Sequence, residues 1–406
     1  MKAYLEGSQA IAKVVALCRP GVISAYPITP QTHIPETLAQ MVAEGELKAE
    51  FVNVESEHSA ASCCLGASAT GVRAYTSTSS QGLLYMLEVL FNIAGLRLPL
   101  VLTCANRAVS APINIWNDYQ DAITLRDSGW IQFYAETIQE AVDLHIQGYR
   151  LSEDIRVLLP VMVNVDGYIL THGYEVVDIP EQELVDKFLP PYQLKYKLDP
   201  DNPLTLGVLA GPDYYMETRF AIQKTMEDVL EIIPEISGEF FEVFARKSGG
   251  LIEGYFLKDA EKVIVAMGSV CGTIKEAIDG LRDKKEKVGL LKIITYRPFP
   301  EEEIYQALKN AREIAVLEKA ISLGGFGPLY TEIKSVFQGK KENPKISGFV
   351  IGLGGRDITK DSIRSVSDRL SGKQVDCEFI DLNLKGEHKD NLLGGSGVAS
   401  QFIEQE

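Results

Sequence analysis

Residues 73–104 have the sequence RAYTSTSSQGLLYMLEVLFNIAGLRLPLVLTC, whose pattern predicts a strand, a helix and a second strand. The β-branched stretch Arg73–Thr78 favours a strand, Leu83–Ala94 favours a helix, and the apolar stretch Leu98–Cys104 favours another strand. A strand that lacks polar positions is typical of a sheet covered on both faces. This unit therefore predicts a parallel, doubly wound α/β sheet.

The same alternation continues on both sides of this unit. Further strands are expected at 22–26, 51–54, 130–135 and 156–165, and further helices after Thr32, at 57–70 with Ser56 as N-cap, and at 139–151. Five prolines between Phe188 and Pro212 predict an extended connector, and a helix is expected at 216–232. Residues 1–235 are thus assigned to a first domain.

A second strand–helix alternation starts after Gly249 and Gly250. Strands are expected at 262–267, 287–294, 313–317 and 346–351, and helices at 273–282, 301–309 and 328–336. We assign residues 250–375 to a second, smaller α/β domain. The polar, glycine-rich residues 376–406 are assigned to a C-terminal tail.

Composition, charge and cysteine spacing limit the classes of function that the chain can have. The 406 residues carry a net charge of −16, which disfavours nucleic acid as a partner. No apolar run suits a membrane helix, and residues 1–13 lack the apolar core of a signal peptide, so a cytoplasmic protein is expected. None of the six cysteines forms a C-x-x-C pair, so an iron–sulfur cluster would have to lie on another chain.

Two loops carry the first candidate site residues. In YPITP (26–30), Pro27 and Pro30 fix the backbone and orient the Thr29 hydroxyl, although a purely structural turn would have the same composition. In VESEHSA (54–60), Glu57 lies at a helix N-terminus, where a carboxylate can bind a ligand nitrogen. It is equally open that Glu57 only interacts favourably with the helix dipole.

Two more loops follow the strands of the first unit. The hydroxyl-rich TSTSSQG (76–82), which contains Ser80, can hold a polar ligand or act only as a helix cap. Arg107 follows an apolar strand, so its charge needs a partner, either a substrate carboxylate or an internal acid. The polar segment 113–130 can cover such a site. The histidines at 33, 145, 172 and 388 are isolated in sequence, and no metal site is expected.

These loops, in this order, resemble the α subunits of 2-oxoacid:ferredoxin oxidoreductases. The resemblance covers nearly the whole chain and depends on ten segments: YPITPQT (26–32), VESEHSA (54–60), GASATGVRAYTSTSSQGL (66–83), GLRLPLVL (95–102), NRAVSAP (106–112), RDSGWIQFYAE (126–136), DGYILTH (166–172), KFLPPY (187–192), YRPFP (296–300) and GFVIGLGGRDIT (348–359). Together these motifs are far more specific than any one of them.

The resemblance implies a fold and a cofactor. The first domain would be the pyrimidine-binding domain of a thiamine-diphosphate enzyme, and the second would resemble the C-terminal domain of transketolase. The cofactor would be shared with a β subunit that supplies the GDG…N motif for Mg²⁺ and diphosphate, because this motif is absent here. The [4Fe-4S] clusters would lie on γ- and δ-type partner subunits, and coenzyme A and ferredoxin would take part in the reaction.

The resemblance also implies roles for particular residues. Glu57 matches the glutamate that binds the cofactor's pyrimidine nitrogen, and Thr29 and Arg107 match the groups that hold the substrate carboxylate. Pro27, Ile28 and Ser80 are the further cofactor-binding candidates. None of these roles follows from spacing or composition alone.

The loop after NRAVSAP is most similar to that of the pyruvate enzymes. The expected reaction is therefore the reversible oxidative decarboxylation of pyruvate to acetyl-CoA and CO₂. Other substrates stay open, namely 2-oxoisovalerate, 2-oxoglutarate and oxalate. The sequence also leaves open a non-catalytic scaffold subunit and an unrelated dinucleotide-binding protein, although no G-x-G-x-x-G motif with a downstream acid supports the latter.

Overall fold

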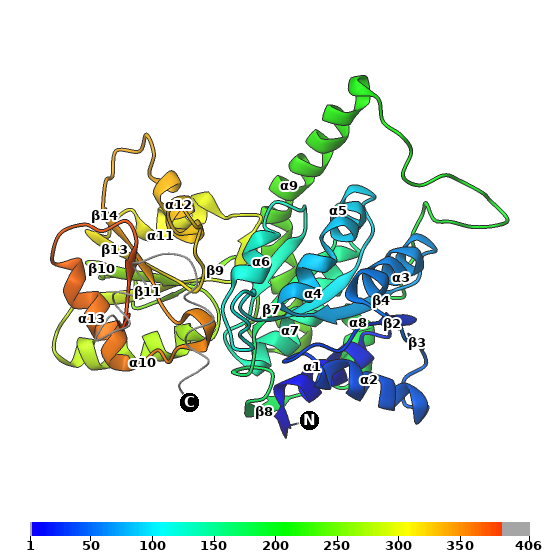
Figure 1. The fold of residues 1–406 in the computed structure, drawn as a ribbon, viewed down its shortest axis with the longest axis horizontal. Coiled ribbons are helices and arrows are strands. Elements are labelled where there is room, and N and C mark those ends of the chain that lie inside the picture. Colours follow the sequence, from blue (N-terminus) through cyan, green and yellow to red (C-terminus); the bar gives the residue numbers. More distant parts are fainter. Residues whose placement is uncertain (1, 384–406) are drawn as a thin grey trace.

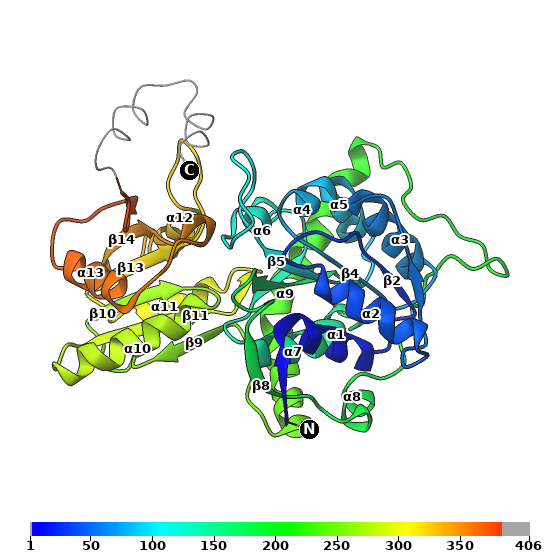
Figure 2. The same cartoon turned by 60° about the horizontal axis from the view of Figure 1, so that its bottom comes forward.

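Two mainly parallel β-sheets carry the fold of residues 2–383, the part of the chain that this computed structural model describes (Figure 1). The sheets lie side by side, and the long helix α9 (Pro212–Phe244) runs past the larger one (Figures 1 and 2). The parallel, doubly wound α/β class expected from the sequence is confirmed. No helix in this described part is long and apolar enough to cross a membrane.

The first sheet has seven strands in the order β12-β6-β7-β5-β4-β2-β3. Six are parallel, and β12 pairs with β6 in the antiparallel direction. The strands are β2 (Val22–Ser24), β3 (Glu50–Val52), β4 (Ala74–Thr78), β5 (Val101–Asn106), β6 (Ile131–Tyr134), β7 (Val161–Asp166) and β12 (Thr295–Arg297). Every residue of β4, β5, β6 and β7 is buried, as expected for strands covered on both faces.

Helices cover both faces of this sheet. One apolar core joins it to α1 (Gly7–Leu17), α2 (His33–Ala43), α7 (Ile138–Ser152), α8 (Gln182–Phe188) and α9. On the opposite face lie α3 (Glu57–Ala69), α4 (Ser80–Tyr85), α5 (Leu87–Gly95) and α6 (Gln120–Thr124). A small antiparallel pair, β1 (Lys2–Glu6) and β8 (Tyr174–Asp178), connects the N-terminus to the segment after β7.

The second sheet has six strands in the order β15-β14-β13-β10-β11-β9, all parallel except β9. They are β9 (Ile252–Tyr255), β10 (Lys262–Ala266), β11 (Val288–Ile293), β13 (Glu313–Glu318), β14 (Lys345–Val350) and β15 (Glu378–Phe379). The helices are α10 (Val270–Asp283), α11 (Glu301–Leu308), α12 (Pro328–Val336) and α13 (Lys360–Leu370), with a 3₁₀ turn, η1 (Leu353–Gly355). Helices α10 and α13 pack on one face.

A shared core joins the two sheets. It runs from α3 and α5 through Trp130 and Tyr134 to Tyr296, and then to α11 and α12. The ring centroids of Tyr134 and Tyr296 are 6.0 Å apart in an edge-to-face arrangement, which suits two aromatic rings. Strand β12 comes from the C-terminal half of the chain but completes the first sheet, so the two halves are connected by a strand as well as by this core.

The connector expected at 188–212 is confirmed, since no helix or strand lies between the end of α8 and the start of α9. The helix expected to end at Ile232 is too short, because α9 continues through Pro234 to Phe244. Proline removes one helical hydrogen bond, but the buried Ile236 and Phe240 keep the last turns packed on the core. The domain boundary expected at residue 235 falls inside this helix.

Three further expectations differ from the structure. The helix expected at 83–94 is two helices, α4 and α5, with Met86 between them. The strand expected from Arg156 begins only at Val161, because residues 155–157 form a turn and Leu158 adopts a positive φ of 44°. The Thr32 hydroxyl makes no capping bond, whereas Ser56 accepts the Ser59 amide as expected.

The division into domains at 1–235, 250–375 and 376–406 stays a prediction. Within the tail, β15 extends the second sheet as far as Phe379, and residues 384–406 lie outside the described residues.

Candidate functional site

Three of the loops singled out in the sequence lie at one edge of the first sheet. They follow β2, β4 and β5, which are neighbours and run parallel, so that their carboxyl ends point the same way. Open α/β sheets bind ligands in the crevice beyond this edge. The structure therefore brings the loops that carry Thr29, Ser80 and Arg107 together.

The buried carboxylate of Asp121, in α6, connects two of these loops. Its Oδ2 accepts the backbone amides of Ser80 and Arg107, both at 3.0 Å, and its Oδ1 accepts the Asn106 side-chain amide at 3.1 Å. Burial raises the pKa of Asp121, and these hydrogen bonds offset part of that increase. Asp121 thus fixes the ends of β4 and β5 relative to each other.

The loop after β2 is fixed by Gln31, whose side chain is fully buried. Its amide nitrogen donates to the Ser77 carbonyl in β4 at 2.8 Å, and its amide oxygen accepts the Ile28 amide at 3.1 Å. Pro27 and Thr29 remain exposed, and Ile28 is half-buried. The loop is therefore held from inside while its outer residues stay accessible.

Arg107 is buried, with 6% of its surface exposed, and among the described residues its guanidinium donates hydrogen bonds to two backbone carbonyl groups. Its Nε donates to the Asn114 carbonyl at 2.9 Å, and one Nη donates to the Thr29 carbonyl at 2.8 Å. It forms no ion pair within residues 2–383, and burial lowers its pKa. A buried cation of this kind is stabilised by an anion, and its planar donors suit a carboxylate.

Thr29 lies directly beside this guanidinium. Its carbonyl is bound to Arg107, and the bond to Pro30 is cis. The described residues offer its hydroxyl no hydrogen-bond partner. An exposed hydroxyl next to a buried cation can supply a second contact to an anionic ligand.

Glu57 is the first residue of α3, and only 9% of its surface is exposed. Its carboxylate has no hydrogen bond or ion pair within the part of the chain that is described. It packs against Gly82, where a β-carbon would lie 2.7 Å from Glu57 Oε1 and 2.5 Å from Thr78 Oγ1. A carboxylate in this position can accept a hydrogen bond from a ligand.

Several buried polar groups near this carboxylate also lack partners. Counting only described residues, four belong to the stretch that runs from β4 into α4: Thr76 Oγ1, Thr78 Oγ1, Ser79 Oγ and Gln81 Nε2. Native proteins leave few buried polar groups unpaired. A polar ligand at this strand end, such as an aminopyrimidine ring, would offer partners to Glu57 and to Thr78 Oγ1, which both lie close to Gly82.

Ser80 is placed differently from its neighbours. Its backbone adopts a positive φ of 49°, and its hydroxyl donates to the Ala108 carbonyl. The hydroxyl thus has a partner inside the protein and joins α4 to the loop that follows Arg107. A role for Ser80 in holding a cofactor stays a prediction.

The loop that covers the site, residues 107–119, is clamped between the two halves of the chain. The Asn114 side chain donates to the Gly354 carbonyl at 3.1 Å, and the Gly355 amide donates to the Asn117 carbonyl at 2.7 Å. Asp118 accepts the Gly354 amide at 3.3 Å, and burial raises the pKa of Asp118 to about 7. The covering role expected for segment 113–130 fits these contacts.

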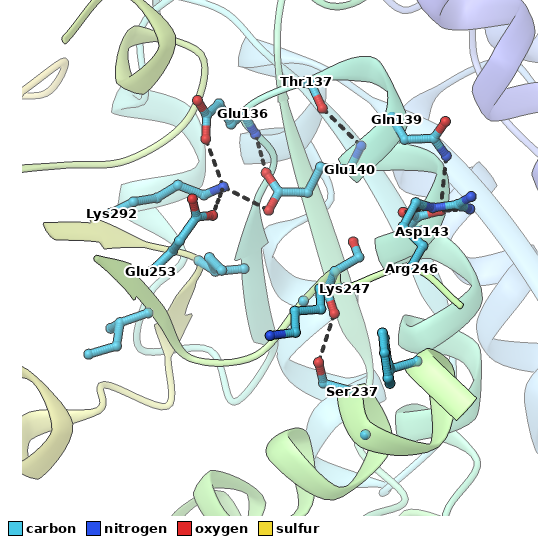
Figure 3. Close-up of a pocket in the computed structure, with 16 residues that line it drawn as sticks. Glu136, Thr137, Gln139, Glu140, Asp143, Ser237, Arg246, Lys247, Glu253 and Lys292 are labelled. Carbon is cyan, nitrogen blue, oxygen red and sulfur yellow. Dashed lines mark hydrogen bonds and ion pairs between the residues drawn. The ribbon is translucent and has the colours of Figure 1, made fainter. Parts of the chain in front are cut away.

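A cavity of about 730 Å³ lies elsewhere, between α7, the end of α9, β9 and β11 (Figure 3). Inside it, Lys292 contacts Glu136, Glu140 and Glu253 at 2.8–3.0 Å (Figure 3). Burial lowers the pKa of Lys292, but the carboxylates raise it more. This network is internally paired and contains none of the candidate site residues, so the cavity is a less suitable ligand site than the sheet edge.

Three residues that shape the site were missed in the sequence, namely Asp121, Gln31 and Gly82. Asp121 lay in a segment expected only to cover the site, and Gln31 and Gly82 were quoted only as parts of loops. No local pattern indicates their partners, because each acts on a residue far away in the chain. The fold and the site together define an α/β protein with a buried carboxylate, Glu57, and a buried guanidinium, Arg107, on loops beyond the carboxyl edge of a parallel sheet.

Comparisons with known proteins give the family. Residues 13–237 match the model described as pyruvate flavodoxin/ferredoxin oxidoreductase, thiamine diphosphate-binding, and residues 260–363 match pyruvate:ferredoxin oxidoreductase core domain II. The pyruvate synthase subunit PorA of Methanothermobacter thermautotrophicus is 52% identical over 94% of this chain and 99% of its own length. The chain therefore belongs to the pyruvate:ferredoxin oxidoreductase family, which confirms the resemblance stated from the sequence.

Two solved structures share the fold. A 2-oxoglutarate:ferredoxin oxidoreductase from Magnetococcus marinus aligns with a TM-score of 0.71 and 19% identity, over 91% of this chain and 65% of that one. A split-gene transketolase aligns with a TM-score of 0.53 and 11% identity, over 91% of this chain and 98% of that one. At these identities the likeness concerns the fold alone, and it confirms the transketolase-like arrangement.

Proposed function

We propose that this chain is the α subunit of a multi-subunit pyruvate:ferredoxin oxidoreductase. The complex would decarboxylate pyruvate oxidatively to acetyl-CoA and CO₂ and pass the electrons to ferredoxin, in a reversible reaction. The observation that carries the proposal is a pair of buried charges, Glu57 and Arg107, which lie on two loops of one sheet edge and form no ion pair with any described residue. The 52% identity to a pyruvate synthase subunit supports pyruvate as the substrate.

Each candidate residue has a definite task in this proposal. Arg107 binds the pyruvate carboxylate through its guanidinium, and the Thr29 hydroxyl supplies a second contact. Glu57 would accept a hydrogen bond from the pyrimidine of thiamine diphosphate, and Pro27, Ile28 and Ser80 would help to hold this cofactor. When bound, thiamine diphosphate supplies the electron sink that loss of CO₂ requires.

The rest of the catalytic centre is assigned to partner chains. No GDG…N motif and no C-x-x-C pair occurs in the 406 residues. We therefore place Mg²⁺ and the diphosphate on a β subunit, and the [4Fe-4S] clusters on γ- and δ-type subunits. The cytoplasm is the proposed location of the complex.

An exposed apolar surface supports assembly with another chain. It lies at the end of the connector and the start of α9, the part of α9 that projects from the rest of the fold in Figure 1. Its exposed residues are Val208, Leu209, Tyr214, Tyr215, Met216 and Phe220. Apolar patches of this kind typically mark protein–protein interfaces.

The proposal is tested in the complex assembled from co-expressed subunits. The chain alone should bind thiamine diphosphate weakly, and the complex should decarboxylate pyruvate and reduce a viologen dye. Glu57→Gln should abolish most activity, whereas Glu55→Gln, which alters an exposed carboxylate two residues earlier, should not. Full activity of the Glu57→Gln complex would contradict the assigned role.

Arg107→Ala tests the substrate contact. Charged hydrogen bonds contribute about 1.5–3 kcal/mol, so the KM for pyruvate should rise by roughly tenfold or more. Arg369→Ala, which removes an exposed cation paired with Glu378, serves as the control and should leave KM unchanged. An unchanged KM and kcat in Arg107→Ala would refute the contact.

The substrate itself is decided by a panel of 2-oxoacids given to the intact complex. Pyruvate should give the highest kcat/KM among pyruvate, 2-oxoisovalerate, 2-oxoglutarate and oxalate. A higher value for another member would keep the chemistry but change the substrate. No activity with any of them, in a fully loaded complex, would favour a non-catalytic scaffold subunit.

A further inference from the structure

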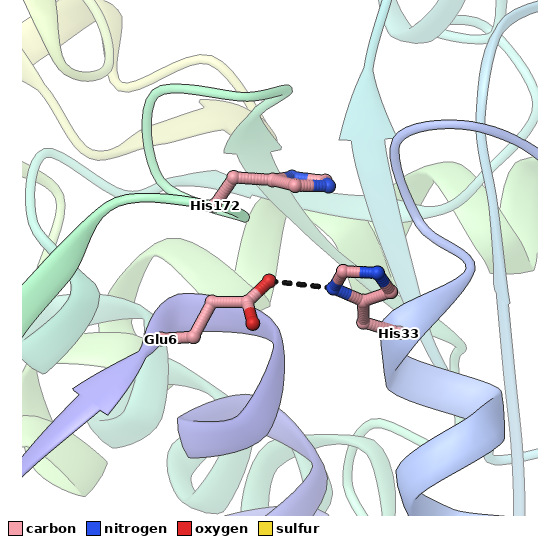
Figure 4. A group of neighbouring side chains, drawn as sticks. All are labelled: Glu6, His33 and His172. Atoms are coloured by element: carbon pink, nitrogen blue, oxygen red, sulfur yellow. Dashed lines mark hydrogen bonds and ion pairs between the residues drawn. The ribbon is translucent and has the colours of Figure 1, made fainter.

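Two histidines and a glutamate meet at the N-terminal corner of the first sheet. Glu6 ends β1, His33 begins α2, and His172 lies in the turn between β7 and β8 (Figure 4). His33 and His172 are isolated from each other in the sequence, but their ring centroids are 4.9 Å apart. Residues from three distant parts of the chain are thus brought into one cluster that the proposed reaction does not use.

The geometry of this cluster suits a metal ion. One ligand atom from each residue lies within 4.8 Å of the other two, and Glu6 Oε1 is 2.7 Å from His33 Nδ1. Two ligands bound at about 2.1 Å in a tetrahedral site are roughly 3.4 Å apart. Side-chain movements of about 1 Å would therefore let the three ligand atoms bind the same metal ion. The His33 side chain, 47% exposed, has the freedom to make them.

Neighbouring groups hold the ligands in place. Glu6 pairs with Tyr174 in the β1–β8 ladder, and the Ser8 amide donates to the Thr171 carbonyl at 2.9 Å. The Thr171 hydroxyl accepts the Tyr168 amide and lies 2.8 Å from His172 Nδ1. A hydroxyl that accepts Nδ1–H fixes the tautomer in which Nε2 is free to bind a metal, as metal-binding histidines typically require.

We propose that Glu6, His33 and His172 form a binding site for a divalent transition-metal ion of the zinc type. Two imidazoles and one carboxylate are a ligand set that such ions prefer, whereas Mg²⁺ and Ca²⁺ select oxygen ligands. The ion would join β1, the start of α2 and the turn after β7. Helix α2 directly follows the loop that carries Thr29, so an ion bound here would stabilise the position of that loop. The ion would take no part in the proposed reaction.

The test uses the full-length chain with Cys63→Ser and Cys377→Ser, since these two cysteines are not buried and could bind zinc themselves. Calorimetric titration with ZnCl₂ should give one Zn²⁺ per chain and a higher thermal midpoint, because binding to the folded state stabilises it. MgCl₂ should produce neither effect. Co²⁺ should give a visible absorption band typical of nitrogen ligation.

Three variants locate the ligands. His33→Ala, His172→Ala and Glu6→Gln should each weaken Zn²⁺ affinity by at least about tenfold and remove the Co²⁺ band. Glu44→Gln, which alters an exposed carboxylate at the other end of α2, should change neither. Circular dichroism of each variant establishes that it is folded.

Two results would overturn the proposal. One is a parent chain that binds Zn²⁺ no more tightly than the Glu6→Gln/His33→Ala/His172→Ala combination. The other is a set of folded single variants whose affinity equals that of the parent. In either case the cluster would be only a hydrogen-bonded Glu6–His33 pair beside a second, tilted histidine ring. Neither result bears on the proposed reaction, because the readouts are binding and stability.

Discussion

At the scale of single residues, the candidate site depends on a contrast between paired and unpaired buried charges. Asp121 is fully buried but accepts five hydrogen bonds, four from N–H groups and one from the Cys104 thiol, so it fixes its surroundings structurally. Glu57 and Arg107 are nearly as buried but form no ion pair within residues 2–383, although the more distant Asp121 carboxylate acts on the Arg107 charge. A buried charge without a partner lowers the free energy of unfolding, so such groups are retained mainly where a ligand pairs with them.

Gly82 supplies a prediction at this scale. A β-carbon there would lie under 3 Å from the side chains of both Glu57 and Thr78, so Gly82→Ala should displace the Glu57 carboxylate. A shift of about 1 Å in a catalytic group can lower the rate by about a hundredfold. We expect such a loss of kcat in the assembled complex, measured by pyruvate-dependent dye reduction.

Gly238→Ala is the matched control for this change. Gly238 also lies inside a helix, α9, but a β-carbon there would meet nothing within 4 Å. Both changes add the same methyl group and the same helix propensity, of about 1 kcal/mol. Equal kcat values for the two variants would mean that Gly82 does not position Glu57.

The places of Thr29, Glu57 and Arg107 could be predicted from the sequence because each follows a strand end or begins a capped helix, whereas their roles came from the resemblance and stay predictions. The Ser56 cap and the apolar strand before Arg107 are local patterns. Asp121 and Gln31 could not be found in this way, because their partners lie in other elements. Their roles arise only when the parallel strands align.

At the scale of elements, the loop 107–119 contains a buried carboxyl group, Asp118, that contacts the second half of the chain. Asp118 accepts the amides of Gln120 at 3.0 Å and Gly354 at 3.3 Å, and it is almost fully buried. Its pKa, about 7, is raised mainly by burial, and Asp121 raises it further, whereas Lys319 lowers it. The loop therefore carries a carboxyl group that changes protonation near neutral pH.

The raised pKa of Asp118 predicts a pH dependence of stability. Because the folded-state pKa of about 7 exceeds the ordinary 3.8, folding favours the protonated form. The free energy of unfolding should fall as pH rises through about 4 to 7 and then level off. Between about pH 5.5 and pH 8.5 this group should contribute a decrease of about 2 kcal/mol.

Asp118→Asn removes this ionisation while keeping an oxygen acceptor. The decrease in unfolding free energy over the same pH range, measured with urea, should therefore shrink by about 2 kcal/mol. Asp127→Asn, at a site with 76% of the side chain exposed, is the control and should leave the pH dependence as it is. An unchanged pH dependence in Asp118→Asn would show that another group is responsible.

Some helices and strands could be predicted from the sequence, and others could not. Long, strongly apolar strands such as β5 and β7 were found because burial on both faces leaves a continuous pattern. The three-residue β12 was missed because it is too short to show a pattern and its partner β6 lies far earlier in the chain. The predicted helix 216–232 stopped before Pro234, whereas α9 continues beyond this proline. The sequence alone does not show that Phe240 packs on the core and stabilises the last turns.

At the scale of the whole molecule, the two sheets are joined by a buried ion pair as well as by a shared apolar core. Lys319, after β13, contacts Asp166, at the end of β7, at 2.6 Å, and their side chains are 4% and 1% exposed. Asp166 also accepts the Tyr119 hydroxyl at 2.7 Å, and Lys319 donates to Asn117 at 2.8 Å. Through Asn117 and Tyr119, the loop 107–119 is therefore hydrogen-bonded to both halves of the chain.

This arrangement predicts that the described part of the chain unfolds as one unit and that the ion pair matters for its stability. Removing one partner of a buried pair leaves the other uncompensated, so Lys319→Met should lower the free energy of unfolding by about 3–5 kcal/mol. Lys224→Met, which breaks an exposed pair with Asp228 on α9, should have a far smaller effect. Differential scanning calorimetry should show one transition for the parent and for Lys319→Met, at a lower temperature in the variant. Two separate transitions in the parent chain would mean that the halves unfold independently, and β12 and the shared core would then not couple them.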